Sequence, residues 1–491
     1  MATDKIASLR ELLTVAEQAV GGVEDERLRV RLLSRIATFY AEAGQRQDAR
    51  RLLDDSVKQF IPMVKAETTD PAIFFKNFLC WSDLTEAQLT CTSLPVTQRW
   101  IDSQQYASRL YQLLFSKLVE DLRSDDAYSI HTRVKTSDRM GELGLNALGQ
   151  LATHYYQLGK MREVESILQQ ATGKTPAVSL FFRNVFAAQA AWKWKQERVV
   201  AQSLLQQADY WHQTFLQQAK SEYAKKARTE QWARLQCMAG DLNAARQTLT
   251  AIELKEPMAI SMQVDDRWYP FEACARELAN FSSPEQVREF LAKPFGKTTL
   301  TEQAIVLALV AVGKDQEFLK QPAVAEPFWK LAAESIRDET VHHPRTLALV
   351  FHRRARQDNG DNWKPRALAA TEKFRQIYTT FMKEASPEDV INLRLTYVID
   401  LLEIGQPDAA FEAMNQYVQQ INKATDKRSA SDSSHYFSEL YRNWPQHHRE
   451  WQQAISKIED KLVRAEACIY SAQGLHRCGV KPPRGLYSTS Y

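Results

Sequence analysis

The stretch from Leu32 to Val57 constrains the fold most, because it reads as two short amphipathic helices joined at Gly44. Apolar residues recur on one face of each helix, so the two faces can pack together. Small side chains at Ala37 and Ala49 would let the two backbones approach closely. The residues of these faces are Ile36, Ala37, Tyr40, Ala49, Leu52 and Leu53. This stretch therefore predicts a helical hairpin.

Imperfect versions of this hairpin recur along the chain. Their ranges are 148–176, 181–218, 224–257 and 393–421, and their turn positions are Gly159, Lys195, Gly240 and Gly405. Positions 159, 195 and 240 are 36 and 45 residues apart, and two-helix repeats have ~34–45 residues. Pro176 lies 17 residues after Gly159, as Pro257 does after Gly240, and should end a second helix. The spacing predicts an array of helix pairs.

A second sequence signal repeats near the two ends of the chain. Ile458-Glu-Asp, followed by Arg464, echoes Val23-Glu-Asp, followed by Arg29. The echo lies within a predicted final helix over 447–473, which thereby repeats the opening sequence of the first hairpin. We interpret it as another repetition of the same unit.

Composition supports an all-α protein. The 491 residues include only 16 glycines and 17 prolines, whereas folds rich in turns use more glycine. The net charge of +3 is too small to indicate nucleic-acid binding by itself. The six cysteines are scattered without a CxxC pair, which argues against a zinc site or a disulfide framework and favours a reducing compartment.

Neither a secretory signal nor a membrane span is visible in the sequence. The N-terminus lacks an apolar signal-peptide core, and no stretch reaches the ~18–20 apolar residues that a bilayer requires. We therefore expect a soluble, cytoplasmic protein.

The pattern divides the chain into four segments. They are 1–122, which contains the hairpin at 32–64; 138–257, with central repeats; 258–423, with further helical repeats; and 436–491, with capping helices and a tail. Helical periodicity is weak in 123–137 and 424–435. A loop is expected in the first of these stretches and a linker in the second.

At its hairpins the chain resembles the tetratricopeptide repeat (TPR) family. That pattern has small residues where the helices cross, an aromatic residue before the turn and a proline at the end. The matches are Ala37, Tyr40, Gly44 and Ala49 in the first hairpin and Leu148, Ala152, Tyr155, Gly159, Ala171 and Pro176 in the second. The resemblance implies a right-handed α-solenoid, which is a superhelix of antiparallel helix pairs.

The resemblance also implies a groove, lined by the first helices, that binds a protein or peptide. The groove positions would be Asn146, Thr153, Tyr156, Gln157 and Arg234. Around the second hairpin these positions form a neutral surface. Paired Lys and Asn residues that clamp a C-terminal carboxylate in some members are not visible.

Motifs that carry catalysis or bind cofactors are missing from the sequence. It contains no HExxH, no phosphate-binding GxxxxGK[ST] loop and no GxSxG elbow. The histidines are isolated apart from two adjacent pairs, and neighbours on a helix point ~100° apart, so they chelate a metal poorly. We expect no enzyme activity, no cofactor and no metal, although a site dispersed along the chain would leave no motif.

One region carries a local excess of positive charge. Residues 341–383 contain nine Lys/Arg and three Asp/Glu, an excess of +6, interleaved with aromatic residues. Its candidate anion-binding residues are Arg353, Arg354, Arg356, Lys364 and Arg366. They could neutralise phosphates while rings stack on bases. We favour the alternative of a solvated helix face, because the spacing of Phe374 and Tyr378 suits burial.

The sequence is typical of a non-enzymatic scaffold or adaptor that binds another protein. Two alternatives stay open: a nucleic-acid-associated repeat protein that uses the region 341–383, and a regulatory subunit of an enzyme complex. The oligomeric state also stays open.

Overall fold

The computed structural model shows a helical chain, which confirms the all-α prediction. Its described residues form helices joined by short turns, with no strand among them. None of the helices in this described part combines the length and apolar character that a bilayer span requires. The described ranges are 2–65, 71–104, 107–134, 142–171, 175–250, 269–279, 282–292, 299–318, 321–357, 362–424 and 427–478.

The helices follow one another closely along the chain. Those before residue 135 are α1 (Ala2–Val20), α2 (Glu26–Glu42), α3 (Arg46–Lys65), α4 (Pro71–Cys91), α5 (Leu94–Asp102), α6 (Ala107–Glu120) and α7 (Ser124–Val134). The next are α8 (Glu142–Gln157), α9 (Met161–Leu168), α10 (Pro176–Lys193), α11 (Arg198–Gln217), α12 (Glu222–Met238), α13 (Leu242–Thr250), α14 (Tyr269–Leu278), α15 (Pro284–Ala292), α16 (Thr299–Phe318) and α17 (Pro322–Ser335). The last are α18 (Pro344–Gln357), α19 (Trp363–Glu384), α20 (Pro387–Glu403), α21 (Pro407–Lys423), α22 (Lys427–Ser433), α23 (Tyr436–Asn443), α24 (His448–Ser456) and α25 (Lys461–His476).

These helices belong to two compact units. Unit 1 consists of the described residues of 1–121, 129–137 and 380–481, so it contains helices from both ends of the chain. Unit 2 consists mainly of the described residues of 138–379. The first and last of the four predicted segments therefore contribute to the same unit.

Helices α2 and α3 form the first predicted hairpin and pack against each other. Asp25 begins α2, because its carboxylate accepts hydrogen bonds from the backbone N–H groups of Arg27 and Leu28 at 2.9 and 3.0 Å. The residues predicted to form the apolar faces are all buried: Ile36, Ala37, Tyr40, Ala49, Leu52 and Leu53. The prediction of a helical hairpin here is confirmed.

Four turns between paired helices share one backbone geometry. Their glycines have positive φ angles: 80° at Gly44, 72° at Gly159, 73° at Gly240 and 82° at Gly405. In each turn the N–H of the following residue donates to a carbonyl five residues earlier, as from Gln45 to Tyr40 at 2.8 Å. A side chain strains this conformation. The glycines predicted to be turn positions are therefore required by the turn itself.

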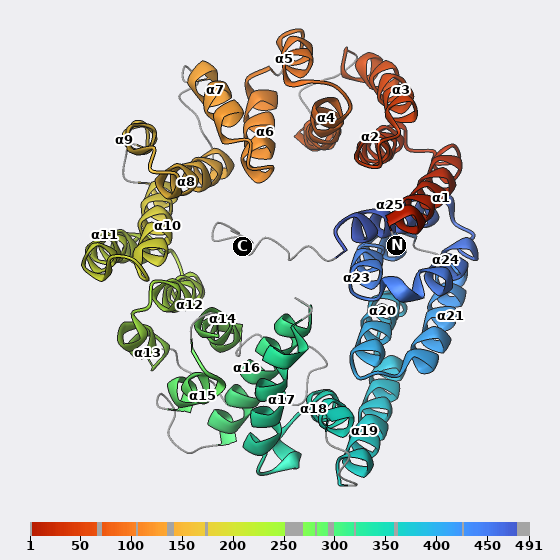
Figure 1. Cartoon of the computed structure of the whole chain (residues 1–491). Helices are drawn as coiled ribbons and strands as arrows, with labels where there is room; N and C mark the ends of the chain where they lie inside the picture. The colour runs from red at the N-terminus through yellow and green to blue at the C-terminus, as the bar shows by residue number, and fades with distance from the viewer. Residues whose placement is uncertain are drawn as a thin grey trace. The chain divides into compact units, whose positions relative to one another are not determined.

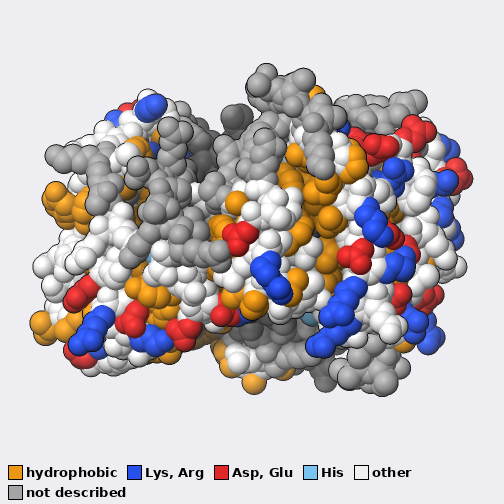
Figure 2. Space-filling model, turned by 90° about the horizontal axis from the view of Figure 1, so that it is seen from above, with side chains coloured by type: hydrophobic (Ala, Val, Ile, Leu, Met, Phe, Trp, Pro, Cys, Tyr) orange, Lys and Arg blue, Asp and Glu red, His pale blue; other side chains and the backbone are white. Residues whose placement is uncertain are grey.

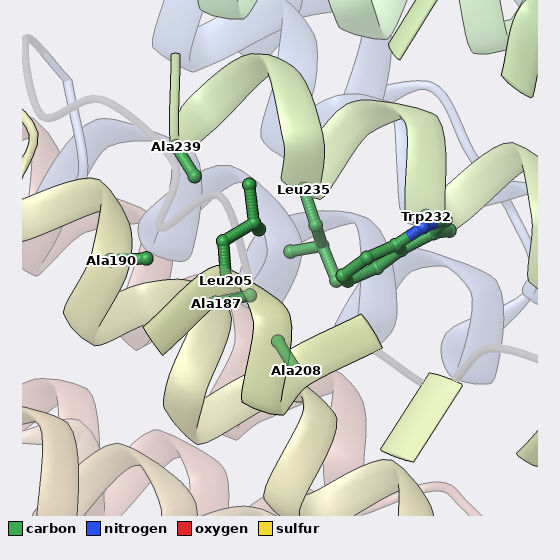
Figure 3. Close-up of a cluster of buried hydrophobic side chains, with 7 residues drawn as sticks. All are labelled: Ala187, Ala190, Leu205, Ala208, Trp232, Leu235 and Ala239. Carbon is green, nitrogen blue, oxygen red and sulfur yellow. The ribbon is translucent and has the colours of Figure 1, made fainter. Parts of the chain in front are cut away.

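The hairpin of α10 and α11 turns without glycine, and a tryptophan links it to the next hairpin. Trp194 packs on Gly240, where an added Cβ would lie only 1.9 Å from the indole. Beneath this contact, alanines of α10 and α11 leave room for Trp232 and Leu235 of α12 (Figure 3). The buried cluster is Ala187, Ala190, Leu205, Ala208, Trp232, Leu235 and Ala239.

In unit 2 the first helix of each pair contacts the first helix of the next pair. The order is α8, α10, α12, α14 and α16, and the second helices of the pairs are α9, α11, α13, α15 and α17 (Figure 1). The five pairs form one continuous array, as a helical-repeat chain requires.

In unit 1 the last helix of the chain packs against the first. Helix α1 lies along α25, as α3 packs on α2 (Figure 1). Asp460 caps α25 by accepting from the N–H of Val463 at 3.0 Å, and Arg464 donates to the carbonyl of Ile458. Arg29 likewise donates to the carbonyl of Val23, at 3.3 Å. The repeated motif thus marks two equivalent first helices, and α25 and α1 form one helix pair from opposite chain ends.

The predicted loop at 123–137 is wrong for its described part, which forms α7. Buried side chains at Ala127, Ile130 and His131 give the helix a narrow apolar face. Because one of the three is a histidine, the face is hard to recognise from hydropathy. Asp125 and Asp126 in the first turn favour its helical start.

The predicted linker at 424–435 is also wrong in its described part, where α22 forms. Its serines behave as small core residues: Ser433 and Ser434 have no exposed surface. The hydroxyls of Ser433 and Tyr417 lie 2.8 Å apart, which satisfies both groups inside the unit. Polar composition therefore concealed a buried helix.

Two helix boundaries differ from the prediction as well. The single final helix expected over 447–473 is broken between α24 and α25, because Asp460 starts a new helix. Pro176 does not end a second helix. It begins α10 behind the capping residue Thr175, and α9 already ends at Leu168.

Candidate protein-binding surface

The predicted groove positions of the second hairpin lie on α8, but only part of them is accessible. Thr153 is 8% exposed, and its hydroxyl donates to the carbonyl of Gly149 at 2.9 Å. Asn146 is half-buried. Tyr156 is half-buried and Gln157 is exposed at the end of α8. A partner could therefore reach Gln157 most readily and Thr153 least readily.

Arg234, the fifth predicted groove residue, ties two first helices together. Its guanidinium on α12 binds one carboxylate oxygen of Glu277 on α14, at 3.1 and 3.2 Å. The two side chains are only 21% and 10% exposed. Partly buried ion pairs of this kind fix geometry, because each charge depends on the other. Arg234 therefore helps to set the register of the first helices.

Similar side-chain bridges join other neighbouring first helices of unit 2. Arg183 of α10 donates to Gln231 of α12 at 3.1 Å. Arg276 of α14 lies 3.3 Å from the carboxylate of Asp315 on α16. The sequence did not reveal these bridges, since the partners are about 40 or more residues apart.

Tyr156 lies near a surface ion pair that joins the ends of α10 and α11. Lys193 and Glu197 are 2.6 Å apart. Burial raises the pKa of Tyr156, with smaller opposing effects from these two charges. Its phenol therefore stays neutral and can exchange hydrogen bonds with a partner.

Exposed apolar side chains lie on both sides of the turn that follows α8 and near the end of α10. Leu158 is 55% exposed, Met161 45% and Trp192 42%. We call Tyr156, Gln157, Leu158, Met161 and Trp192 the α8–α10 edge. Tyrosine, tryptophan and methionine are enriched at protein interfaces, and tyrosine and tryptophan most often carry binding energy. The three apolar members were missed in the sequence, although two of them flank the turn at Gly159.

Two of the five candidate anion-binding residues, both arginines, are held by carboxylates within unit 2. Arg353 binds Glu317 through two nitrogens, at 2.9 and 3.0 Å. Arg366 donates to Glu339 at 2.8 Å. Because these guanidiniums already face carboxylates, their charge is largely neutralised within the unit.

Aromatic rings lie against the guanidinium groups of Arg354 and Arg366. The guanidinium carbons of Arg354 and Arg366 lie 5.6 and 4.9 Å from the ring centre of Trp363, and Arg366 also lies 4.2 Å from that of Phe351. Burial, followed by the neighbouring Arg353, lowers the pKa of Arg356. Lys364 lies exposed at the start of α19.

The aromatic side chains of this basic region pack inward. Phe374 is 1% exposed and Tyr378 2%, which confirms the burial predicted from their spacing. Phe351 has no exposed surface. Base stacking needs a free ring face, so these three rings cannot serve it. On the face of the molecule that Figure 2 shows, Lys and Arg side chains lie among Asp and Glu side chains.

Unit 1 holds a group of ionisable side chains at the ends of its first helices. Lys117 of α6 lies 2.9 Å from Glu86 of α4 and 3.5 Å from Asp121. Glu42 of α2 lies 3.5 Å from His476 of α25. Burial raises the pKa of Glu42 to about 7, and it also raises the pKa of Glu120. In the described part of the chain, no three His, Cys, Asp or Glu side chains are arranged to hold a metal ion.

A cavity of about 310 Å³ lies in unit 1 between α1, α24 and α25. Leu12, Ile455 and Cys468 contribute buried side chains to its lining, and Glu11 and Arg449 contribute charges. Burial raises the pKa of Cys468 to about 12. Its thiol therefore stays protonated near neutral pH and is a poor nucleophile.

Comparisons with known proteins assign no family to this chain. No family model matches it, and no curated protein matches its sequence. Among solved structures it is similar to a chain described as "Circular tandem repeat protein with novel repeat topology and enhanced subunit contact surfaces". The sequence identity is 12%, the match covers 97% of this chain and 98% of that one, and the TM-score is 0.18.

Proposed function

We propose that the protein is a non-enzymatic helical-repeat scaffold that binds a protein or peptide partner in the cytoplasm. The observation that carries this proposal is the α8–α10 edge. It comprises a neutral phenol, an amide and three exposed apolar side chains at the ends of α8 and α10 and at the start of α9. Such a combination of an apolar contact area with polar neighbours is typical of a binding hot spot.

We further infer that the pairs are antiparallel TPR-like hairpins stacked with a right-handed twist. The shared turns at Gly44, Gly159, Gly240 and Gly405 support this inference, because one turn geometry repeated along a chain gives one repeated pairing. The first helices would then present their side chains along one surface. The α8–α10 edge would form one border of that surface.

No specific observation favours the two alternative functions. The basic region of 341–383 directs Arg353 and Arg366 to carboxylates of unit 2, and Phe351, Phe374 and Tyr378 point into its core. This arrangement favours a structural role for the region over binding of nucleic acid. A regulatory subunit would use the same partner surface, and its partner would then be an enzyme.

Affinity capture with the full-length chain tests the proposal. We expect that Tyr156→Ala combined with Trp192→Ala abolishes capture of the partner, which mass spectrometry identifies. The matched control is Arg162→Ala with Glu165→Ala, because both residues are exposed on α9 of the same hairpin. The control should bind like the wild type. If no partner is enriched, or if the double variant retains it, the α8–α10 edge is not the binding surface.

A further inference from the structure

The outward face of α11 between Val199 and Tyr210 has no fully exposed charged side chain, and the half-buried Asp209 at its edge accepts a hydrogen bond from Gln213 at 3.4 Å. Val199 is 81% exposed and Tyr210 66% exposed, and glutamines and a serine fill the positions between them. The exposed residues from 199 to 210 are Val199, Val200, Gln202, Ser203, Gln206, Gln207 and Tyr210. We call the set Val199, Gln202, Ser203, Gln206, Gln207 and Tyr210 the α11 face.

The equivalent second helix of the first hairpin shows how unusual this face is within the chain. Exposed positions of α3 are Arg46, Gln47, Arg50, Arg51, Asp54, Lys58 and Pro62. All but two of these carry a charge. Charged residues make up 25% of the whole chain, so a solvated helix would ordinarily include several. The α11 face therefore differs from a surface that only faces water.

The other side of α11 is fixed in the core. Leu205 and Ala208 pack against alanines of α10 and against α12 (Figure 3). His212, which is 1% exposed, stacks on Trp232 with ring centres 4.7 Å apart. Because these contacts anchor the helix along its length, the α11 face is a preorganised surface.

The α11 face is complementary to itself. A two-fold axis midway between positions 204 and 205 exchanges 199 with 210, 202 with 207, and 203 with 206, so each exposed position meets an exposed position. Val199 would then pack on the ring of Tyr210, an apolar contact repeated twice. Glutamine amides donate and accept hydrogen bonds equally, so they can pair with copies of themselves. No like charges would meet.

We propose that the α11 face binds a second copy of this chain, helix against antiparallel helix, and forms a symmetric dimer. Two-fold pairing uses the same patch on both subunits. The α11 face spans residues 199–210 of this helix, a stretch about 18 Å long at ~1.5 Å per residue. A single helix on each side is smaller than the ~800 Å² per partner of a standard stable interface. We therefore expect a weak, reversible dimer.

Sedimentation velocity of the full-length chain between about 1 and 100 μM tests this proposal. The sedimentation coefficient should rise from that of a monomer to that of a dimer over this range. Ser203→Lys with Gln206→Lys places lysine opposite lysine and should weaken the dimer at least tenfold. Ser203→Glu with Gln206→Glu should do the same. An equimolar mixture of the two variants should restore a dimer, because each lysine then faces a glutamate.

A third variant tests the direction of pairing. Ser203→Lys with Gln206→Glu places lysine opposite glutamate in an antiparallel pair, so this chain should dimerise by itself. In a parallel pair the same charges would repel. Gln47→Lys on α3 controls for added charge and should leave the dimer unchanged. A wild type that stays monomeric to 100 μM, or a dimer that survives both double like-charge variants, would overturn the proposal.

Discussion

The two units differ in the kind of ionisable group whose pKa is shifted by burial. In unit 1 burial raises the pKa of carboxyl groups: Glu42 reaches about 7, and Glu120, Asp83 and Glu466 are also raised. In unit 2 burial lowers the pKa of histidines: His212 falls to about 2 and His343 to about 4, and His342 and His352 are also lowered. Both effects have one cause, since burial disfavours the charged form of either group.

This difference teaches that the same helical hairpin can be adapted to opposite pH responses. A carboxyl group with a raised pKa binds protons more tightly in the folded state, so its unit loses stability as pH rises through about 4.5–7. A histidine with a lowered pKa binds protons more tightly in the unfolded state, so its unit loses stability as pH falls below about 6.5. The predictions below test whether the units behave separately.

The largest effect should come from cavities placed in one unit at a time. Leu13 in α1 and Leu309 in α16 have no exposed surface and belong to unit 1 and unit 2, respectively. Each substitution by alanine should cost about 2–5 kcal/mol. Differential scanning calorimetry should show two transitions, with Leu13→Ala lowering one and Leu309→Ala lowering the other. A single transition that both variants lower equally would remove the distinction between the units.

Overpacking should give a smaller effect of the same kind. Ala37 and Ala49 of unit 1 and Ala152 of unit 2 are fully buried where paired helices meet. Leucine at any of these positions should cost about 1–3 kcal/mol. Thermal melts should show Ala37→Leu or Ala49→Leu lowering the unit 1 transition and Ala152→Leu the unit 2 transition. Midpoints equal to the wild type would mean that the helices do not cross closely there.

Acidification should move the two transitions in opposite directions. Between pH 8 and pH 5 we expect unit 1 to gain and unit 2 to lose stability, by on the order of 2 kcal/mol for each strongly shifted group. Calorimetry across this range measures both. Glu42→Gln should flatten the response of unit 1 alone, and His212→Phe should reduce that of unit 2 alone. Parallel movement of the two transitions would contradict the comparison.

The smallest expected effect is on the binding of nucleic acid by unit 2. Since Arg353 is paired with Glu317 and Arg366 with Glu339, unit 2 should show no binding in the micromolar range at ~150 mM salt. Filter binding with single- and double-stranded nucleic acid measures this. Micromolar binding that the combined changes Arg353→Ala, Arg356→Ala and Trp363→Ala abolish would instead support the nucleic-acid alternative.

Local features of the fold could be predicted from the sequence. The turn at Gly44 and the faces around Ala37 and Ala49 depend on residues within one hairpin, so periodicity and turn chemistry reveal them. The α22 helix was missed because its core residues are serines, which hydropathy counts as polar. Long-range partners were missed for a different reason. Nothing near Arg234 in the sequence points to Glu277, 43 residues away.

The candidate site was predictable only in part. Tyr156 and Gln157 were predicted from their place on a first helix, and in the structure Tyr156 is half-buried and Gln157 exposed. Met161 and Trp192 were not identified, because exposed apolar residues resemble core residues until burial is known. The sequence likewise could not show whether the charge of Arg353 is free to bind an anion, because this depends on its ion-pair partner and on its exposure.

Pairing of α25 with α1 has a consequence for synthesis of the chain on the ribosome. About 440 residues separate the end of α1 from the start of α25, and translation at ~5–20 residues/s takes roughly 20–90 s to cover them. Throughout this time the leucine-rich face of α1 has no α25 to cover it. The main part of unit 2, residues 138–379, is continuous in sequence and can fold meanwhile. We expect α1 to be the segment of the nascent chain that most needs a chaperone.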